Sequence, residues 1–314
     1  MFELSGEHIV FVGALLLFVA VLAGKAAYRL GAPALLLFLG VGVLFGYNDF
    51  VSFHSVDFAE FVGMVALCII LFGGGMDTTF ADIRPVMIPG VIMATLGVAL
   101  TATIVGLFIY FIAPLIGVSQ EISLPFALLM AATMSSTDSA SVFSILRTKK
   151  QGLNENLRPL LELESGSNDP VAYILVVLLV GILSPNGEAM SIGTSIVMFL
   201  VQMVVGAIAG YCFGRAAVWT MNKINISNAS LYSVLLLAFV FLAFSFTTLA
   251  QGNGYLAVYI AGLVVGNKKI VHKRTVVTFF DGVTWLVQII MFIMLGLLVD
   301  LHQIIDNPKI LLLG

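Results

Sequence analysis

Long apolar runs, separated by short polar stretches, dominate this sequence and limit what it can fold into. There are ten of them, at residues 8–28, 32–47, 58–76, 86–113, 123–146, 158–183, 191–220, 229–250, 253–267 and 277–299. Because about 20 apolar residues cross the hydrocarbon core of a bilayer, each run predicts one membrane-spanning helix, the second and ninth being short. The sequence therefore predicts an all-α, polytopic membrane protein with one transmembrane domain over residues 1–314.

Composition excludes several classes of protein. Only 10% of the 314 residues are charged and 60% are hydrophobic, whereas a soluble domain has about 25% charged residues. A soluble enzyme is excluded on this ground, and the net charge of −3 offers no basic surface for nucleic acid. The two cysteines, Cys68 and Cys212, lie in apolar runs and indicate neither a disulfide framework nor a zinc site. We expect no cofactor.

Lys and Arg fall almost entirely on one side of the predicted membrane. If the ten spans alternate in direction, 13 of the 14 basic residues lie on one side and only Lys309 lies on the other. Cytoplasmic loops carry the excess of Lys and Arg. We therefore expect a multi-pass protein of the cell membrane with an external N-terminus.

An eleventh apolar run begins at Ile310 and includes only five residues, up to Gly314. Since a membrane protein is not expected to end just inside a span, we interpret the chain as part of a longer protein. On this interpretation the 314 residues alone do not transport ions, because the missing half would supply one wall of the site.

A weak internal repeat spans much of the chain. Gly42-Val-Leu-Phe-Gly46 in the second run matches Gly262-Leu-Val-Val-Gly266 in the ninth, 220 residues later. Leu71-Phe-Gly73, followed by Asp77, matches Met294-Leu-Gly296, followed by Asp300, 223 residues later. Helices seven spans apart cross in opposite directions, so the pattern predicts an inverted repeat of the kind found in transporters. The alternative is that such glycine spacings are common in any membrane helix.

Two carboxylates are predicted at membrane depth. Asp138 lies roughly 13 Å along its helix from Arg147, and Asp169 lies roughly 16 Å from Arg158, at about 1.5 Å per residue. Ionisable residues inside a membrane are costly and default to functional roles. The pair predicts a cation site near the middle of the bilayer.

The polar residues around both carboxylates fit this prediction. The stretch from Ser135 to Ser141 contains five Ser or Thr, which can weaken a helix by bonding to its carbonyls, and Gly166 and Pro170 are expected to interrupt the next helix. Unwound backbone exposes carbonyl oxygens, which together with hydroxyls and carboxylates suit an alkali cation. The lack of nearby His or Cys argues against a transition metal. For the hydroxyls alone, hydrogen bonding between helices is the alternative role.

Asp169 can carry either a proton or a cation. Burial favours the protonated carboxyl, whereas a bound cation favours the carboxylate. If the site opens to each side in turn, this mutual exclusion produces obligatory exchange.

At these residues the sequence resembles the NhaP-type monovalent cation:proton antiporters, specifically the potassium/proton branch, over the whole chain. The motifs that carry the resemblance are Ser136-Thr-Asp-Ser-Ala-Ser-Val-Phe-Ser144, Glu164-Ser-Gly-Ser-Asn-Asp-Pro170, Leu71-Phe-Gly-Gly-Gly-Met-Asp77 and the stretch from Gly254 to Asn267. The second of these is the most specific.

The resemblance implies a secondary active antiporter, not an enzyme, with an inverted-repeat fold, discontinuous helices and alternating access. It implies a homodimer that exchanges K⁺ or Na⁺ for H⁺, with the ion held by Thr137, Asp138, Ser165 and Asp169. Asn168 stands where electrogenic relatives carry Asp, which implies electroneutral exchange.

Two departures from the family pattern are visible. Many relatives have an acidic residue at the position of Gly73; Asp77, one turn on, is either a partial substitute or the polar end of a helix. Relatives also pair the equivalent of Glu164 with an Arg beyond the tenth span. No Arg follows Arg274 here, so we expect this Arg and the second interrupted helix to lie beyond residue 314, which leaves Glu164 without its Arg partner in this chain.

Three other classes fit the sequence less well. A cation channel needs a selectivity ring, and no such stretch is present. A non-transporting membrane subunit of a proton-pumping complex predicts Lys in the middle of spans, whereas every basic residue lies at a span end or in a loop. An intramembrane hydrolase needs a base beside its nucleophile, and no His lies in the middle of a span.

Overall fold

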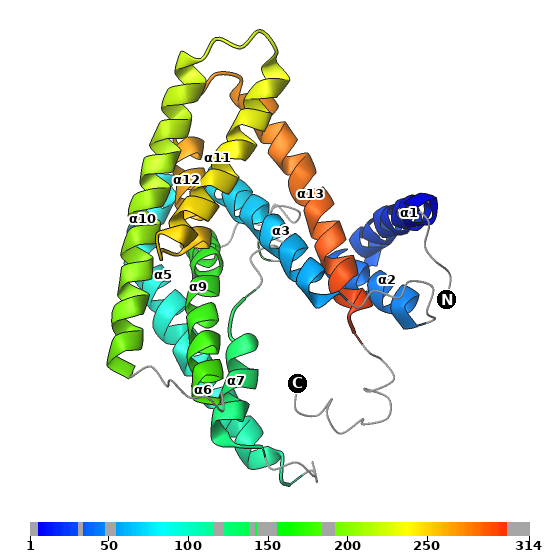
Figure 1. Ribbon diagram of the computed structural model, residues 1–314, viewed down its shortest axis with the longest axis vertical. Helices are drawn as coiled ribbons and strands as arrows, with labels where there is room; N and C mark the ends of the chain where they lie inside the picture. Colours follow the sequence, from blue (N-terminus) through cyan, green and yellow to red (C-terminus); the bar gives the residue numbers. More distant parts are fainter. Residues whose placement is uncertain are drawn as a thin grey trace. The chain divides into compact units, whose positions relative to one another are not determined.

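The computed structural model of the chain describes residues 6–30, 34–47, 55–115, 122–137, 142, 156–183 and 192–299. The described residues form helices joined by turns (Figure 1). One compact unit contains the described residues up to Leu67 and from Gly282 onward, and the other contains those from Cys68 to Asp281. The main helices are α1 (Gly6–Leu30), α2 (Ala34–Tyr47), α3 (Val56–Asp77), α6 (Val98–Ile112), α7 (Leu124–Thr133), α9 (Leu157–Leu183), α10 (Ile192–Lys223), α11 (Ala229–Leu249), α12 (Gly254–Gly266) and α13 (Lys273–Leu297).

Helix length agrees with a multi-pass membrane protein. Seven helical segments in the described part of the chain are long and apolar enough to cross a bilayer, and three apolar helices are shorter: α2, α7 and α12. Each of these ten falls within or across one of the predicted runs, and the second and ninth runs are short, as expected. Whether all ten cross the membrane remains a prediction.

The fourth predicted run is one segmented helical stretch rather than a regular helix. α4 (Phe80–Ile83), a 3₁₀ turn (Arg84–Val86), α5 (Met87–Ile92) and a π turn (Met93–Gly97) precede α6. Pro85 and Pro89 each lack the N–H that a regular α-helix needs. At the π turn, the hydroxyl of Thr95 donates to the carbonyl of Val91 at 2.7 Å.

The predicted interruption of the sixth span at Gly166 and Pro170 is wrong. α9 is helical without a break from Leu157 to Leu183. Pro170 removes only the N–H that would bond to the carbonyl of Gly166, and the other backbone bonds of a membrane helix are sufficient to carry the helix through one such loss.

Small residues let α10 and α12 approach closely (Figure 1). A Cβ added at Gly206 would lie 2.8 Å from the carbonyl oxygen of Asn253, and one at Gly210 would lie 2.8 Å from the Cα of Ala257. The next turn repeats the pattern with Gly214. Close backbone approach at glycines drives the association of helices in lipid, where the hydrophobic effect contributes little.

Within the second unit, glycines bring α12 against the C-terminal part of α3. A Cβ at Gly262 would collide with the carbonyl oxygen of Phe72, and a Cβ at Gly75 would collide with that of Tyr259. Each helix therefore presents a glycine to the backbone of the other.

Within the first unit, α2 and the C-terminal part of α13 make the same contact. A Cβ at Gly42 would collide with the carbonyl oxygen of Ile293, and a Cβ at Gly296 would collide with that of Leu39. Adding 220 to the α2 numbers gives the α12 residues, and subtracting 221 from the α13 numbers gives the α3 residues. A third pair of contacts obeys the same rule: Gly46 with Leu297, and Gly266 with Met76.

The internal repeat is thus present in the helix contacts as well as in the sequence. The predicted offset of 220 between the second and ninth runs is confirmed. The predicted offset of 223 for the other pair is wrong, because the contacts align Gly75, not Gly73, with Gly296. Asp77 is then the equivalent of Leu298 and not of Asp300.

Candidate functional site

The polar stretch after α7 interrupts the fifth predicted span. α7 ends at Thr133, and residues 134–137 are not helical. The hydroxyls of Thr133 and Ser135 donate to the carbonyls of Met130 and Ala132, at 2.7 and 2.8 Å. Such bonds compete with the helical pattern. The expected unwinding is confirmed over residues 134–137, which is as far as the described residues extend here apart from Val142.

The non-helical segment lies against one face of α9. α7 and α9 pack against each other, and the facing residues of α9 follow helical spacing, Glu164 with Asn168 and Ser165 with Asp169, each pair one turn apart. Ser165 and Asn168 are completely buried, whereas Glu164 and Asp169 are half-buried. An unbroken α9 therefore serves as the rigid side of the site.

Asn168 is the centre of a hydrogen-bond network that joins these two segments. Its Nδ2 donates to Oγ1 of Thr137 at 2.5 Å and to Oε1 of Glu164 at 2.9 Å. Its Oδ1 accepts from the hydroxyl of Ser136 at 2.8 Å. Both amide hydrogens and the amide oxygen are engaged, so the side chain holds the unwound segment and α9 in one geometry.

Glu164 is hydrogen bonded within the described residues, and the Arg partner that the family resemblance implies for it remains an expectation. Its carboxylate accepts hydrogen bonds from Asn168, as above, and from the hydroxyl of Thr137 at 3.2 Å. Neutral donors from the network therefore satisfy this carboxylate within the described part of the chain.

Asp169 is reached by Ser136, a residue that sequence reasoning did not select. The hydroxyl of Ser136 lies 2.5 Å from Oδ1 of Asp169 as well as within bonding distance of Asn168. A hydroxyl has one hydrogen, so it can donate to only one of these oxygens at a time. The available signal was position: Ser136 directly precedes Thr137 in the Ser/Thr-rich stretch from Ser135 to Ser141.

Ser165 connects α9 to the backbone of the unwound segment. Its buried hydroxyl donates to the carbonyl of Thr137 at 3.3 Å. Carbonyl and hydroxyl oxygens both retain lone pairs in this arrangement. Together with the carboxylate of Asp169, they make a cluster of hard oxygen ligands of the kind that binds alkali and other hard cations.

Packing from two sides fixes α9 behind these groups. A Cβ at Gly90 of α5 would lie 2.6 Å from Cδ2 of Leu163, and a Cβ at Gly166 would lie 3.0 Å from the ring of Tyr259 on α12. The segmented α5 and the π turn also contact α9. Glycines thus allow close approach on both sides, as in other membrane helix contacts.

Five of the predicted site residues come together in the structure: Thr137, Glu164, Ser165, Asn168 and Asp169. Asp138, the sixth, lies outside the described residues, as do the residues from 139 to 141. Gly73 is buried in α3, and Asp77 is exposed as the last residue of that helix.

Comparison with known proteins supports the class that the sequence motifs indicate, the monovalent cation:proton antiporters. The sequence profile of the family described as "Sodium/hydrogen exchanger, transmembrane" matches residues 14–314. The chain is 37% identical over 302 residues to the K⁺/H⁺ antiporter NhaP of Alkalimonas amylolytica, covering 95% of this chain and 50% of that protein. It is 36% identical over 297 residues to the K⁺/H⁺ antiporter NhaP2 of Shewanella oneidensis, covering 94% and 50%. The chain thus spans about half the length of these relatives.

Two further similarities are more distant. The Na⁺/H⁺ antiporter ApNhaP of Aphanothece halophytica is 26% identical over 287 residues, which cover 89% of this chain and 52% of that protein. The solved structure of the sodium proton antiporter MjNhaP1 from Methanocaldococcus jannaschii at pH 8 superimposes with a TM-score of 0.75 at 21% identity, covering 97% of this chain and 75% of that one. This likeness shows the expected all-α, inverted-repeat antiporter fold. The chain belongs to the transmembrane sodium/hydrogen exchanger family.

Proposed function

We propose that the protein is a secondary active antiporter that exchanges a monovalent cation for H⁺ across the cell membrane. The observation that carries this proposal is the network around Asn168, which joins an unwound segment to a continuous helix and leaves a carboxylate, Asp169, among hard oxygen ligands. Elements that interrupt a membrane helix in this way build the ion sites of transporters.

K⁺ is the proposed cation, with Na⁺ as the second candidate. The relatives at 36–37% identity are named K⁺/H⁺ antiporters, whereas the one at 26% is named a Na⁺/H⁺ antiporter. Both ions use the same oxygen ligands, so the choice rests on these relatives and not on the geometry of the site.

The proposed ion ligands are Thr137, Asp138, Ser165 and Asp169. In the structure the hydroxyl of Thr137 is engaged on both sides, by Asn168 and by Glu164, which favours its carbonyl oxygen as the ligand. Asn168 and Glu164 act as supporting residues that hold Thr137 in place. Asp138 belongs to the proposal on its sequence position alone.

Ser136 supplies a simple response to the protonation state of Asp169. When Asp169 is ionised, the hydroxyl of Ser136 can donate to it. When Asp169 is protonated, its O–H can donate to Ser136, whose own hydrogen then turns to the oxygen of Asn168. The hydroxyl of Ser136 therefore has an acceptor in both states, and loss or gain of the proton on Asp169 switches that acceptor between Asp169 and the amide oxygen of Asn168.

The proposed exchange is electroneutral, which the family resemblance implies for a chain with Asn at position 168 where electrogenic relatives carry Asp. An amide cannot ionise, so Asp169 is the ionisable member of the Asn168–Asp169 pair and binds one proton or one monovalent cation.

The proposed assembly is a homodimer embedded in the lipid bilayer. Each chain crosses the membrane several times and has an external N-terminus, and residues 1–314 contribute to a single transport domain.

Flux in vesicles tests this function. The protein at its full natural length is reconstituted, a pH jump is imposed, and K⁺, Na⁺ or choline is supplied outside. We expect K⁺ to dissipate the pH gradient fastest, Asp169→Asn to abolish the effect and choline to give none. Single-channel currents, or gradient-driven flux retained in Asp169→Asn, would contradict the proposal, the former in favour of the channel alternative.

A further inference from the structure

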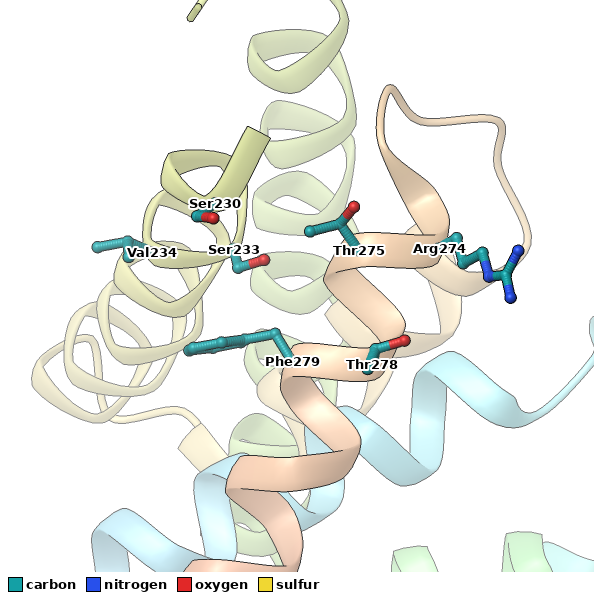
Figure 2. A pocket seen from close by; sticks show the side chains of 7 residues that line it. All are labelled: Ser230, Ser233, Val234, Arg274, Thr275, Thr278 and Phe279. Atoms are coloured by element: carbon teal, nitrogen blue, oxygen red, sulfur yellow. The ribbon is translucent and has the colours of Figure 1, made fainter. Parts of the chain in front are cut away.

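A groove of about 550 Å³ lies between the first turns of α11 and α13, separate from the ion network. Small-molecule sites have volumes of roughly 300–1,000 Å³. Four hydroxyl side chains line the groove, Ser230 and Ser233 from α11 and Thr275 and Thr278 from α13 (Figure 2). A space lined by hydroxyl side chains from two helices is suited to a ligand with several hydrogen-bond acceptors.

Ser233 is the residue that points to a ligand. It is only 1% exposed, and within the described residues its Oγ has no hydrogen-bond partner. Figure 2 shows this hydroxyl directed from α11 toward α13, across the groove. A buried hydroxyl without a partner is destabilising, and an acceptor bound in the groove would remove that cost.

The electrostatics of the groove favour an anion. Arg274 is its charged lining residue, and no Asp or Glu is among the described residues that line it. Figure 2 shows the guanidinium extended away from α11, and the long Arg side chain has several rotatable bonds between this group and α13. The N-termini of α11 and α13 lie at this end, where the helix dipoles favour negative charge. Exposed Lys268 and Lys269 precede α13.

The remaining surroundings are apolar. Phe279 and Val234 complete the lining, and Val234 and Leu231 on α11 are 53% and 48% exposed. Large exposed apolar side chains on a membrane-spanning helix face acyl chains. A ligand here therefore meets hydroxyls and a cation at one end and lipid at the other.

We propose that this groove binds the phosphate group of an anionic phospholipid. The phosphate oxygens accept from Ser233 and the neighbouring hydroxyls, and Arg274 balances the negative charge. Its acyl chains continue past Val234 into the bilayer. Basic residues beside a span attract anionic lipid in general, and the buried hydroxyl of Ser233 adds a specific contact to that attraction.

The test compares thermal unfolding of the full-length protein in nanodiscs of phosphatidylcholine alone and with added phosphatidylglycerol. We expect phosphatidylglycerol to raise the Tm of the wild type by several degrees. Ser233→Ala should lose most of that rise, while its Tm in phosphatidylcholine alone stays at or above the wild-type value, because the unpaired hydroxyl is gone. Arg274→Gln should also lose most of the rise.

Thr247→Val provides the matched control. Thr247 lies on the same helix, is completely buried and has an Oγ1 without a partner within the described residues, but it does not line the groove. This variant should keep the full rise. An undiminished rise in Ser233→Ala and Arg274→Gln would overturn the site, and an equal rise from inorganic phosphate in phosphatidylcholine nanodiscs would overturn a lipid as its ligand.

Discussion

At the scale of single residues, Asn168 determines the arrangement of the candidate site. It is completely buried and contacts Ser136, Thr137 and Glu164 at once. An Asp at this position would accept hydrogen bonds but could donate only when protonated. The amide therefore matters for geometry as well as for charge, since its two hydrogens hold Thr137 and Glu164 together.

Replacing Asn168 by Asp should destabilise the protein in a pH-dependent way. The new carboxylate would lie one turn from Glu164, and two ionised carboxylates at that distance repel each other. Protonation of either one removes the repulsion and restores a donor, so the loss in Tm relative to the wild type should grow as pH rises. Thermal unfolding over about pH 5 to 9 measures this. Asn168→Ala is the control: it should be destabilised at every pH, and the same flat profile in Asn168→Asp would contradict the account.

Thr137 should tolerate Ser but not Ala. Thr137→Ala leaves an amide hydrogen of Asn168 and an oxygen of Glu164 without this partner, at a cost of about 1–3 kcal/mol in the free energy of unfolding. Thr137→Ser keeps the hydroxyl and should unfold and transport nearly as the wild type does. Denaturant unfolding together with cation-dependent flux separates the two variants, and equal stability of both would show that the hydroxyl does not hold the network.

The hydroxyl of Ser165 donates to the carbonyl of Thr137, whereas the hydroxyl of Thr137 has two side-chain partners, Asn168 and Glu164. Ser165→Ala should raise the apparent KM for the cation, with the amount of folded protein unchanged. Thr137→Ser is the control for this comparison of KM values, because it retains the carbonyl that is the proposed ligand and should keep a wild-type KM. A wild-type KM in Ser165→Ala would assign this hydroxyl to helix packing.

At the scale of helices, the sequence predicted which segments are helical and where they lie better than it predicted whether each helix is unbroken. The ten apolar runs correspond to described helices because length and hydropathy determine which segments can cross a bilayer. The unwinding after Thr133 was also predictable, since several hydroxyls in one short stretch compete with the backbone. The continuity of α9 through Gly166 and Pro170 was not predictable from the sequence, because a proline removes one backbone hydrogen bond and the remaining bonds of the helix can be sufficient to keep it unbroken.

The sequence predicted most of the residues of the candidate site but not the hydrogen bonds that join them. Charged residues at membrane depth identified Asp169, and the motif identified Thr137, Ser165, Asn168 and Glu164. Ser136 was missed because its position beside Thr137 does not separate it from the other Ser and Thr of the stretch until its partners Asn168 and Asp169 are known. The register of the repeat was misread for the same reason, since three consecutive glycines at 73–75 offer three alignments.

The glycine contact between α3 and α12 should be intolerant of even one methyl group. Gly262→Ala places a Cβ against the carbonyl oxygen of Phe72, and such overpacking costs about 1–3 kcal/mol. Gly63→Ala, in α3 but with no atom near its added Cβ, should be neutral or slightly stabilising, because Ala favours the helix. Unfolding of both variants in detergent checks this, and equal stability would contradict the close contact. By the repeat, Gly42→Ala should behave as Gly262→Ala does.

At the scale of the whole molecule, the internal repeat produces two equivalent helix pairs, one in each unit. α2 with α13 and α12 with α3 use the same backbone contacts at offsets of 220 and 221 residues. Transporters built from such repeats move one part against another around a central ion. The non-helical segment and α9 lie in the unit that contains the α3–α12 pair.

Electroneutral exchange predicts the response of the whole protein to voltage. If one proton is exchanged for one monovalent cation, no net charge moves, so neither rate nor direction should respond to membrane potential. Cation-driven pH changes in vesicles should be the same at zero and at an imposed potential of about −100 mV, although that potential is worth about 2.3 kcal/mol for each net charge moved. A transient current on a solid-supported membrane, proportional to flux, would contradict one-for-one exchange.

The central claim is that Asp169 binds a proton or a cation, but never both. The most direct measurement is proton release on addition of K⁺ to the purified, full-length protein in weakly buffered detergent solution. The account predicts that the wild type releases close to one proton for each K⁺ bound, and that Asp169→Asn releases none while remaining folded. K⁺ binding without proton release in the wild type, or undiminished release from Asp169→Asn, would contradict it.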